Sequence, residues 1–195
     1  MKQIAIAILA GGRSRRMGRD KAALPWDGGT LLERLARVAL ATHCPTRVIG
    51  RARPDDWMLP SVTFHPDRHP EMGPLGGVLT ALEAGEEPIL AVACDMPRLD
   101  ARALGWLLKI ARDLPCESTG VAARNGDQTE PLFAVYGQSL REIAAARIAA
   151  GRLSLGGMIA DAALTIVDVP EEIRASLMNV NTPEEWRDLD RKDTQ

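Results

Sequence analysis

Short apolar runs alternate along the chain with longer segments in which apolar residues recur every three or four positions. The first run, residues 3–9, is rich in β-branched residues and ends at two glycines, which is typical of a strand buried on both faces of a sheet. Further runs of this kind predict strands over residues 47–50, 62–64, 89–94, 120–123, 132–136 and 164–167.

The segments between these runs carry the signals of helices. Thr30 and Glu33 have the spacing of a capping box, and the apolar residues that follow share one face of a helix. Thr182 and Glu185 mark another helix start in the same way. Composition and apolar spacing predict further helices over residues 75–84, 101–111 and 140–149.

Strands that alternate with helices predict βαβ units. We therefore expect an α/β fold of the Rossmann-like kind, with a mostly parallel sheet and helices on both faces. No repeat, low-complexity tract or linker divides the chain, so residues 1–195 are expected to form a single domain. The last few residues, 192–195, are expected to be frayed.

Charge is balanced over the whole chain and concentrated in one place. Lys and Arg number 24 against 26 Asp and Glu, a net charge of −2, which is unlike the strongly basic proteins that bind nucleic acid through bulk phosphate attraction. Aromatic residues make up only 4%, too few for a base-stacking surface, so no nucleic-acid partner is expected. Residues 13–21 carry a net charge of +4, which leaves −6 for the rest. Attraction for anions is therefore local.

Cysteine usage and the start of the chain indicate a cytoplasmic protein. The three cysteines include no CxxC pair, which argues against a disulfide framework and against a cysteine zinc site. The short apolar run at residues 3–9 leads into glycines and arginines, so it is not expected to be a secretory signal. No stretch approaches the ~18 apolar residues of a membrane helix, so no membrane partner is expected.

Ligands of an open α/β sheet gather beyond the carboxyl ends of its strands, and the segment after the first strand is built for an anion. Residues 9–21 read LAGGRSRRMGRDK. The glycines allow a sharp turn that aims backbone N–H groups at phosphates, while Arg16 and Lys21 supply positive charge. Neither GxGxxG nor GxxxxGK[ST] fits the segment. A solvated arginine-rich turn is the alternative reading.

Asp95 follows the predicted strand over residues 89–94. A carboxylate at this position faces the ligand edge of the sheet and suits Mg²⁺, which binds through one or two carboxylates together with phosphate oxygens. The alternative is that Asp95 only caps the following helix or turn.

The segment over residues 65–77 offers a second polar contact. His65 and His69 are four residues apart, like a zinc pair, but the prolines beside them oppose the helix that such a pair needs. Asp67 is the candidate contact for a ligand. Three glycines after it would let a flat ligand approach the backbone: Gly73, Gly76 and Gly77. An ordinary loop of prolines and glycines is the alternative.

Two asparagines flank a valine shortly before the last predicted helix. In extended geometry Asn179 and Asn181 face the same side and could hydrogen-bond a polar substrate, or serve only in a turn and a helix cap. Nucleophilic catalysis has little support, because Cys94 lies inside an apolar run and no GxSxG motif occurs.

Taken together, these motifs resemble the molybdenum cofactor guanylyltransferase (MobA) family, one group among the Rossmann-like nucleotidyltransferases. The pattern LAGG-x-S-x-RMG-x-DK is complete at residues 9–21, GPLGG stands at 73–77 and CD-x-P at 94–97. The segment NVNTPEE at 179–185 is the most diagnostic, because the wider group shares the first motif but usually not this one.

The resemblance implies roles for individual residues. It assigns to the guanine nucleotide the backbone of Leu9, Ala10 and Gly11, the side chain of Lys21 at the phosphates, and the carboxylates of Asp67 and Asp95. Asp95 would also hold Mg²⁺, and Asn179 with Asn181 would line the pterin side. Many members carry an asparagine where residues 50–53 read GRAR here, and a late arginine of the family finds only a loose match in Arg152.

The implied reaction transfers GMP from GTP to the terminal phosphate of the molybdenum cofactor and releases pyrophosphate. A phosphate monoester has a second pKa near ~6, so it is an ionised nucleophile at neutral pH and needs no general base. Arg16 and Lys21 would offset charge on the leaving pyrophosphate, while Mg²⁺ on Asp95 would orient the α-phosphate.

The resemblance also suggests a monomer that makes transient contacts with cofactor-delivery proteins or molybdoenzyme chaperones. Two other classes of function stay open. One is a related nucleotidyltransferase, either the cytidylyl counterpart, in which LAAG is usual, or a sugar-phosphate enzyme. The other is a non-catalytic nucleotide-binding module, against which the intact Lys21 and Asp95 count.

Overall fold

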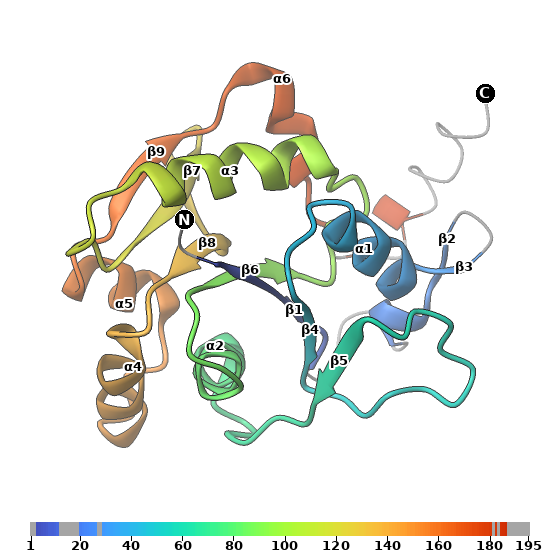
Figure 1. Ribbon diagram of the computed structural model, residues 1–195, viewed down its shortest axis with the longest axis horizontal. Helices are drawn as coiled ribbons and strands as arrows, with labels where there is room; N and C mark the ends of the chain where they lie inside the picture. Colours follow the sequence, from blue (N-terminus) through green and yellow to red (C-terminus); the bar gives the residue numbers. More distant parts are fainter. Residues whose placement is uncertain (1–2, 12–19, 27–28, 181, 183, 187–195) are drawn as a thin grey trace.

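A mixed seven-stranded sheet crosses the molecule, with strand order β5-β4-β1-β6-β8-β7-β9 (Figure 1). The structure, a computed structural model, describes residues 3–11, 20–26, 29–180, 182 and 184–186. The strands of this sheet are β1 (Ala5–Leu9), β4 (Thr46–Ile49), β5 (Val62–His65), β6 (Ile89–Ala93), β7 (Gly120–Asn125), β8 (Gln128–Tyr136) and β9 (Thr165–Asp168).

Six of the seven strands point the same way, as a mostly parallel sheet requires. β1 is parallel to β4 and β6, β4 is parallel to β5, and β7 is parallel to β9. β8 runs antiparallel to both of its neighbours because only Gly126 and Asp127 separate it from β7. The prediction of a mostly parallel sheet is confirmed, and the reversed strand follows from this short hairpin.

Helices cover both faces of the sheet, as predicted (Figure 1). One layer holds α1 (Leu31–Leu40), α3 (Ala101–Asp113) and α6 (Glu171–Arg174), and the other holds α2 (Gly73–Glu83), α4 (Leu140–Ala149) and α5 (Leu155–Asp161). β1 shows how one strand serves both layers, since Ile6 and Ile8 join the core under the first while Ala5 and Ala7 join the core under the second. Among the described residues, no helix combines the length and the apolar character needed to cross a membrane.

The predicted helix starts are present. The Glu33 N–H donates to the Thr30 hydroxyl at 3.2 Å and the Thr30 N–H donates to the Glu33 carboxylate at 2.8 Å, which completes the capping box of α1. Thr182 and Glu185 exchange the same two bonds at 3.2 and 3.3 Å. The expectation of frayed terminal residues lies outside the described part of the chain.

Short elements complete the fold where the sequence pattern is weak. They are the 3₁₀ turns η1 (Lys21–Ala23) and η2 (Ala175–Leu177), and the hairpin of β2 (Pro25–Trp26) with β3 (Gly29–Thr30). α5 was not predicted, because two glycines weaken its helix propensity. Tertiary contacts compensate: the buried Arg147 of α4 pairs with Asp161, and Gly157 leaves room for its guanidinium.

The ends of β1 and β4 approach each other so closely that both must carry glycine. The Ala10 N–H donates to the Ile49 carbonyl at 2.9 Å, which draws the two chains together at this point. A Cβ on Gly50 would lie 2.5 Å from the Gly11 Cα, and Gly50 also has φ of +96°. The backbone after β1 and β4 is therefore shaped by contact within the fold.

We expect Gly50→Ala to destabilise the protein by about 3 kcal/mol or more, because it adds a clash with Gly11 to the strain of a positive φ. Gly151→Ala is the matched control: Gly151 has φ of +69° but no atom within 4 Å of its added Cβ. It should cost only about 1 kcal/mol. Urea unfolding of both variants gives the comparison, and equal losses would show that the close approach does not matter.

Candidate functional site

The carboxyl ends of four parallel strands meet at one edge of the sheet, and the predicted ligand residues follow them. Leu9 ends β1 and is continued by Ala10 and Gly11, Asp67 follows β5, and Asp95 follows β6. This edge is where an open α/β sheet binds its ligands. The fold therefore brings together the three segments that the sequence analysis singled out after these strands.

Lys21 joins three parts of the chain at this edge. Its Nζ donates to the Asp95 carboxylate at 3.1 Å and to the Val180 carbonyl at 2.9 Å. The Val180 N–H in turn donates to the Asp95 carbonyl at 2.9 Å. The segment around Asn179 is thus bonded both to Lys21 and to Asp95, which follows β6.

This network bears on two individual residues. Lys21 follows the arginine-rich segment, and only 17% of its side chain is exposed. The alternative for Asp95 was a cap of the following helix or turn, but α3 is capped by Asp100, whose carboxylate accepts from the Ala103 N–H at 2.7 Å. The Asp95 carboxylate, 26% exposed, is directed to Lys21 instead.

The residues after β4 face the start of η1. Arg51 forms an ion pair with Asp20, and Asp20 also caps η1 by accepting from the Ala22 N–H at 3.1 Å. Arg51 therefore helps to place Lys21, the residue that follows Asp20. In this chain Arg51 thus has a structural role within residues 50–53, where many family members carry an asparagine.

Asp67 is tied into its own loop. Its Oδ1 accepts from the His69 N–H at 2.9 Å and from the Thr80 hydroxyl of α2 at 3.1 Å. Thr80 also accepts from the Arg68 N–H at 3.1 Å. The carboxylate thus shapes the loop between β5 and α2.

The histidines and glycines of this loop have partners of their own. His65 contacts Thr63 and His69 contacts Glu83, each at 3.2 Å, and no group of three metal-ligating side chains occurs among the described residues. A Cβ on Gly76 would lie 2.5 Å from the His69 carbonyl, so this glycine admits the loop and not a ligand, contrary to expectation. Gly77 packs against the Leu9 side chain, while Gly73, with φ of +62°, has open space beside it.

Glu130 is a residue of this edge that the sequence analysis missed. It lies half-buried near the start of β8, and burial together with the nearby charge of Asp95 raises the pKa of its carboxyl. Only the antiparallel direction of β8 brings its first residues to the carboxyl ends of β6 and β7. The sequence shows only a carboxylate, Glu130, just before the proline that precedes a predicted strand. Its place in the site cannot be inferred until the direction of β8 is known.

The polar groups here suit a phosphate ligand with a hard cation. Asp95 follows β6, and Glu130 lies on the neighbouring strand β8. Mg²⁺ takes one or two carboxylates and completes its shell with phosphates and water. Lys21 supplies positive charge beside them. Asp95 and Glu130 are thus the described residues that could hold Mg²⁺.

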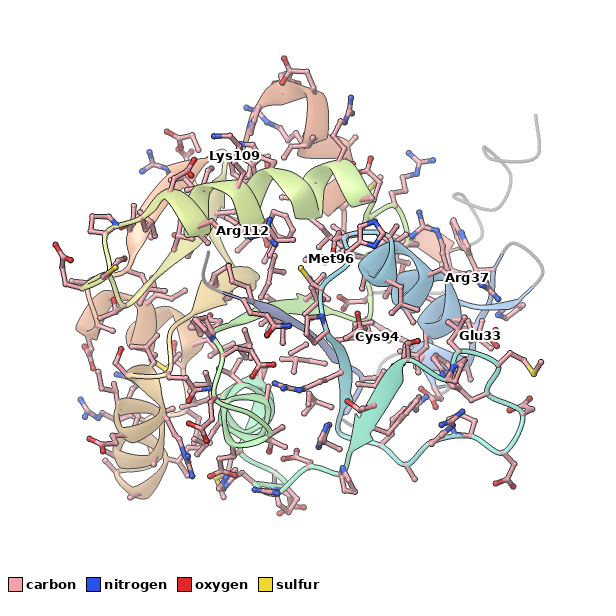
Figure 2. All side chains as sticks on the ribbon, viewed as in Figure 1. Glu33, Arg37, Cys94, Met96, Lys109 and Arg112 are labelled. Carbon is pink, nitrogen blue, oxygen red and sulfur yellow. The ribbon has the colours of Figure 1, made fainter. Side chains whose placement is uncertain are left out.

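Cys94, beside Asp95, is not equipped as a nucleophile. Its side chain is buried, and burial followed by the Asp95 charge raises the pKa of its thiol to about 12. In Figure 2 it is labelled together with Met96, the other neighbour of Asp95 in the sequence. A neutral thiol inside the core cannot attack a substrate.

The remaining candidate residues divide into described and undescribed ones. Asn179 is exposed beside the buried Val180, in keeping with an alternating extended segment. Arg16 and Asn181 lie outside the described residues. The Arg152 Nη1 lies 3.6 Å from the Asp161 carboxylate that also pairs with Arg147, so it serves the contact between α4 and α5.

Comparison with known proteins agrees with this geometry. The family described as the MobA-like NTP transferase domain matches residues 6–162, which include the ends of β1, β5 and β6. The structure also resembles that of molybdopterin-guanine dinucleotide biosynthesis protein A from Archaeoglobus fulgidus, with a TM-score of 0.77, 22% identity and coverage of 97% of this chain and 98% of that one.

Curated relatives match over nearly the whole length, including the segment around Asn179. A probable molybdenum cofactor guanylyltransferase of Opitutus terrae is 35% identical over 97% of this chain and 95% of its own. The molybdenum cofactor guanylyltransferase of Xanthomonas euvesicatoria is 35% identical over 93% of this chain and 92% of its own. The chain therefore belongs to the MobA-like NTP transferase family of nucleotidyltransferases.

Proposed function

We propose that the protein transfers GMP from GTP to the terminal phosphate of the molybdenum cofactor, forming the guanine dinucleotide cofactor and pyrophosphate. The observation that carries the proposal is the pair of hydrogen bonds that the Lys21 ammonium donates to the Asp95 carboxylate and to the Val180 carbonyl. These bonds join Lys21, at the end of the positively charged segment, to the carboxylate after β6 and to the segment that is most diagnostic of this family. The names of the full-length relatives point to the same reaction.

The chemistry needs positioning and charge more than a base. An ionised oxygen of the acceptor phosphate attacks the α-phosphorus of GTP, and the bond to the bridging oxygen breaks so that its electron pair leaves with pyrophosphate. Lys21 stabilises negative charge that builds on the phosphates, and Arg16 is proposed to do the same. The inert Cys94 is consistent with direct transfer.

The nucleotide is proposed to lie along the ends of β1 and β5. The backbone of Leu9, Ala10 and Gly11 would contact guanine, and Asp67 would contact the nucleotide with the carboxylate oxygen that does not hold the loop. Mg²⁺ bound at Asp95, with Glu130 beside it, would neutralise phosphate charge.

The acceptor is proposed to lie on the other side of Asp95, along Asn179 and Asn181. Amide groups offer donors and acceptors to a heterocycle without adding charge beside a phosphate nucleophile. We further propose a monomer in the cytoplasm that receives the cofactor through transient contacts with delivery proteins or chaperones. The three cysteines, all outside disulfides, suit a reducing compartment.

The proposal is tested by pyrophosphate release from a panel of four nucleoside triphosphates in the presence of purified molybdenum cofactor and Mg²⁺. We expect release with GTP only, and none when the cofactor is left out. Preference for CTP would identify the cytidylyl counterpart. Binding of GTP without release under any condition would indicate a non-catalytic nucleotide-binding module.

Asp95→Asn should lower turnover at least about a hundredfold, because an amide keeps the shape but loses the charge that a hard cation requires. Removal of Mg²⁺ with a chelator should have a comparable effect on the wild type. The matched control is Asp113→Asn, which breaks the exposed Lys109–Asp113 ion pair on α3 and should leave turnover unchanged. Full activity in Asp95→Asn would remove this carboxylate from the mechanism.

A role of Asp67 in ligand binding can be separated from its role in the loop by comparison with a variant of its partner Thr80. Thr80→Val removes the bond from Thr80 to Asp67 and the bond from the Arg68 N–H, without removing a group proposed to touch the ligand. We expect it to lower stability by about 1–2 kcal/mol. Asp67→Ala should have a similar effect on stability and should also weaken GTP binding several-fold more than Thr80→Val does. Calorimetry of both variants decides the point, since equal GTP affinities would leave Asp67 a loop residue only.

A further inference from the structure

Two contacts of the described residues join residues 20–26 to the segment around Asn179, here called the acceptor-side segment. The first is the bond from Lys21 to the Val180 carbonyl. The second is an edge-to-face contact between Trp26 and Trp186, with ring centroids 5.1 Å apart and planes inclined at 66°. Both contacts join the few residues after η1 begins to the few residues that surround Asn179 and follow it.

Each ring of the tryptophan pair is held by a hydrogen-bonded frame. Trp26 pairs with Gly29 in the β2–β3 hairpin, which continues directly into α1, and the Leu31 N–H donates to the Leu24 carbonyl at 2.9 Å across its base. Trp186 closes the turn begun by Thr182, to whose carbonyl its N–H donates at 3.1 Å. The contact therefore links α1 to the acceptor-side segment, here residues 178–180, 182 and 184–186.

The two contacts respond differently to a bound nucleotide. Phosphate oxygens are stronger acceptors for the Lys21 ammonium than a carbonyl is, so a triphosphate competes for the bond to Val180. The aromatic contact carries no net charge and buries apolar surface, so a triphosphate does not compete for it. When GTP is bound, the tryptophan pair therefore still holds the acceptor-side segment, together with the backbone bond from the Val180 N–H to the Asp95 carbonyl.

We propose that Trp26 is a positioning residue for the acceptor: through Trp186 it holds the segment that carries Asn179, without itself touching a substrate. The inference rests on the proposed function, in which this segment binds the pterin. Lys21 cannot test it, because its substitution removes a phosphate contact and the Val180 bond together. Trp26 separates these effects, because it contacts Trp186 and is not among the residues placed at the nucleotide.

The experiment compares Trp26→Ala and Trp26→Phe with the wild type. Two quantities are measured: the KM values for molybdenum cofactor and for GTP, and hydrogen exchange of the amides over residues 178–186. We expect Trp26→Ala to raise the KM for the cofactor about three- to tenfold, to leave the KM for GTP within twofold, and to speed exchange at these amides. Trp26→Phe keeps an aromatic edge, so its KM for the cofactor and its exchange rates should stay close to those of the wild type.

Trp106→Ala is the matched control, because Trp106 is half-buried like Trp26 and stacks on Phe133 in another part of the same core. It should change neither the ratio of the two KM values nor exchange over residues 178–186. Trp186→Ala removes the same contact from the other side and replaces Trp26→Ala if that variant does not fold. The variant that combines Trp26→Ala with Trp186→Ala should raise the KM for the cofactor no more than the more damaging single substitution does.

Unchanged exchange over residues 178–186 in both single variants would overturn the inference, whatever the activity. Faster exchange with an unchanged cofactor KM would also overturn it, because the segment would then not position the acceptor. The proposed function fails in a different way, through a wild-type protein that transfers no GMP to the cofactor.

Discussion

The bonds of Lys21 are the contacts on which the arrangement of the site depends. One ammonium group holds the carboxylate after β6 and the carbonyl of Val180, which lie 74 and 159 residues away in the sequence. A charge so little exposed is tolerated because a carboxylate neutralises it. The ion pair neutralises the charges of Lys21 and Asp95 at this edge of the sheet. The site is therefore assembled before its substrates arrive.

The backbone around this pair is held by close glycine contacts and by side-chain bonds within the fold. Gly11 and Gly50 bring the ends of β1 and β4 within reach, and Arg51 then pairs with Asp20 next to Lys21. Asp67 closes the following loop onto α2 through Thr80. Loops fixed in this way keep their N–H groups in place, so binding a charged ligand loses little conformational entropy at this edge.

Negative charge gathers around Asp95 at the same edge of the sheet. Burial and then the charge of Asp95 raise the pKa of Glu130, and the same two causes raise the pKa of Cys94 to about 12. A concentration of negative charge that is only partly neutralised by Lys21 favours a divalent cation. This charge supports the proposal that Mg²⁺ binds here together with the triphosphate.

Most strands and helix starts of this protein could be predicted from its sequence, because they depend on local patterns of residues. The alternation of apolar runs, the capping boxes at Thr30 and Thr182, and the motifs after β1 and β6 each depend on neighbours a few residues apart. Only the tertiary structure decided that β8 runs backwards and brings Glu130 to Asp95, that Gly76 makes room for a carbonyl, and that Trp26 meets Trp186. These are contacts between residues distant in the sequence, and periodicity and propensity carry no information about them.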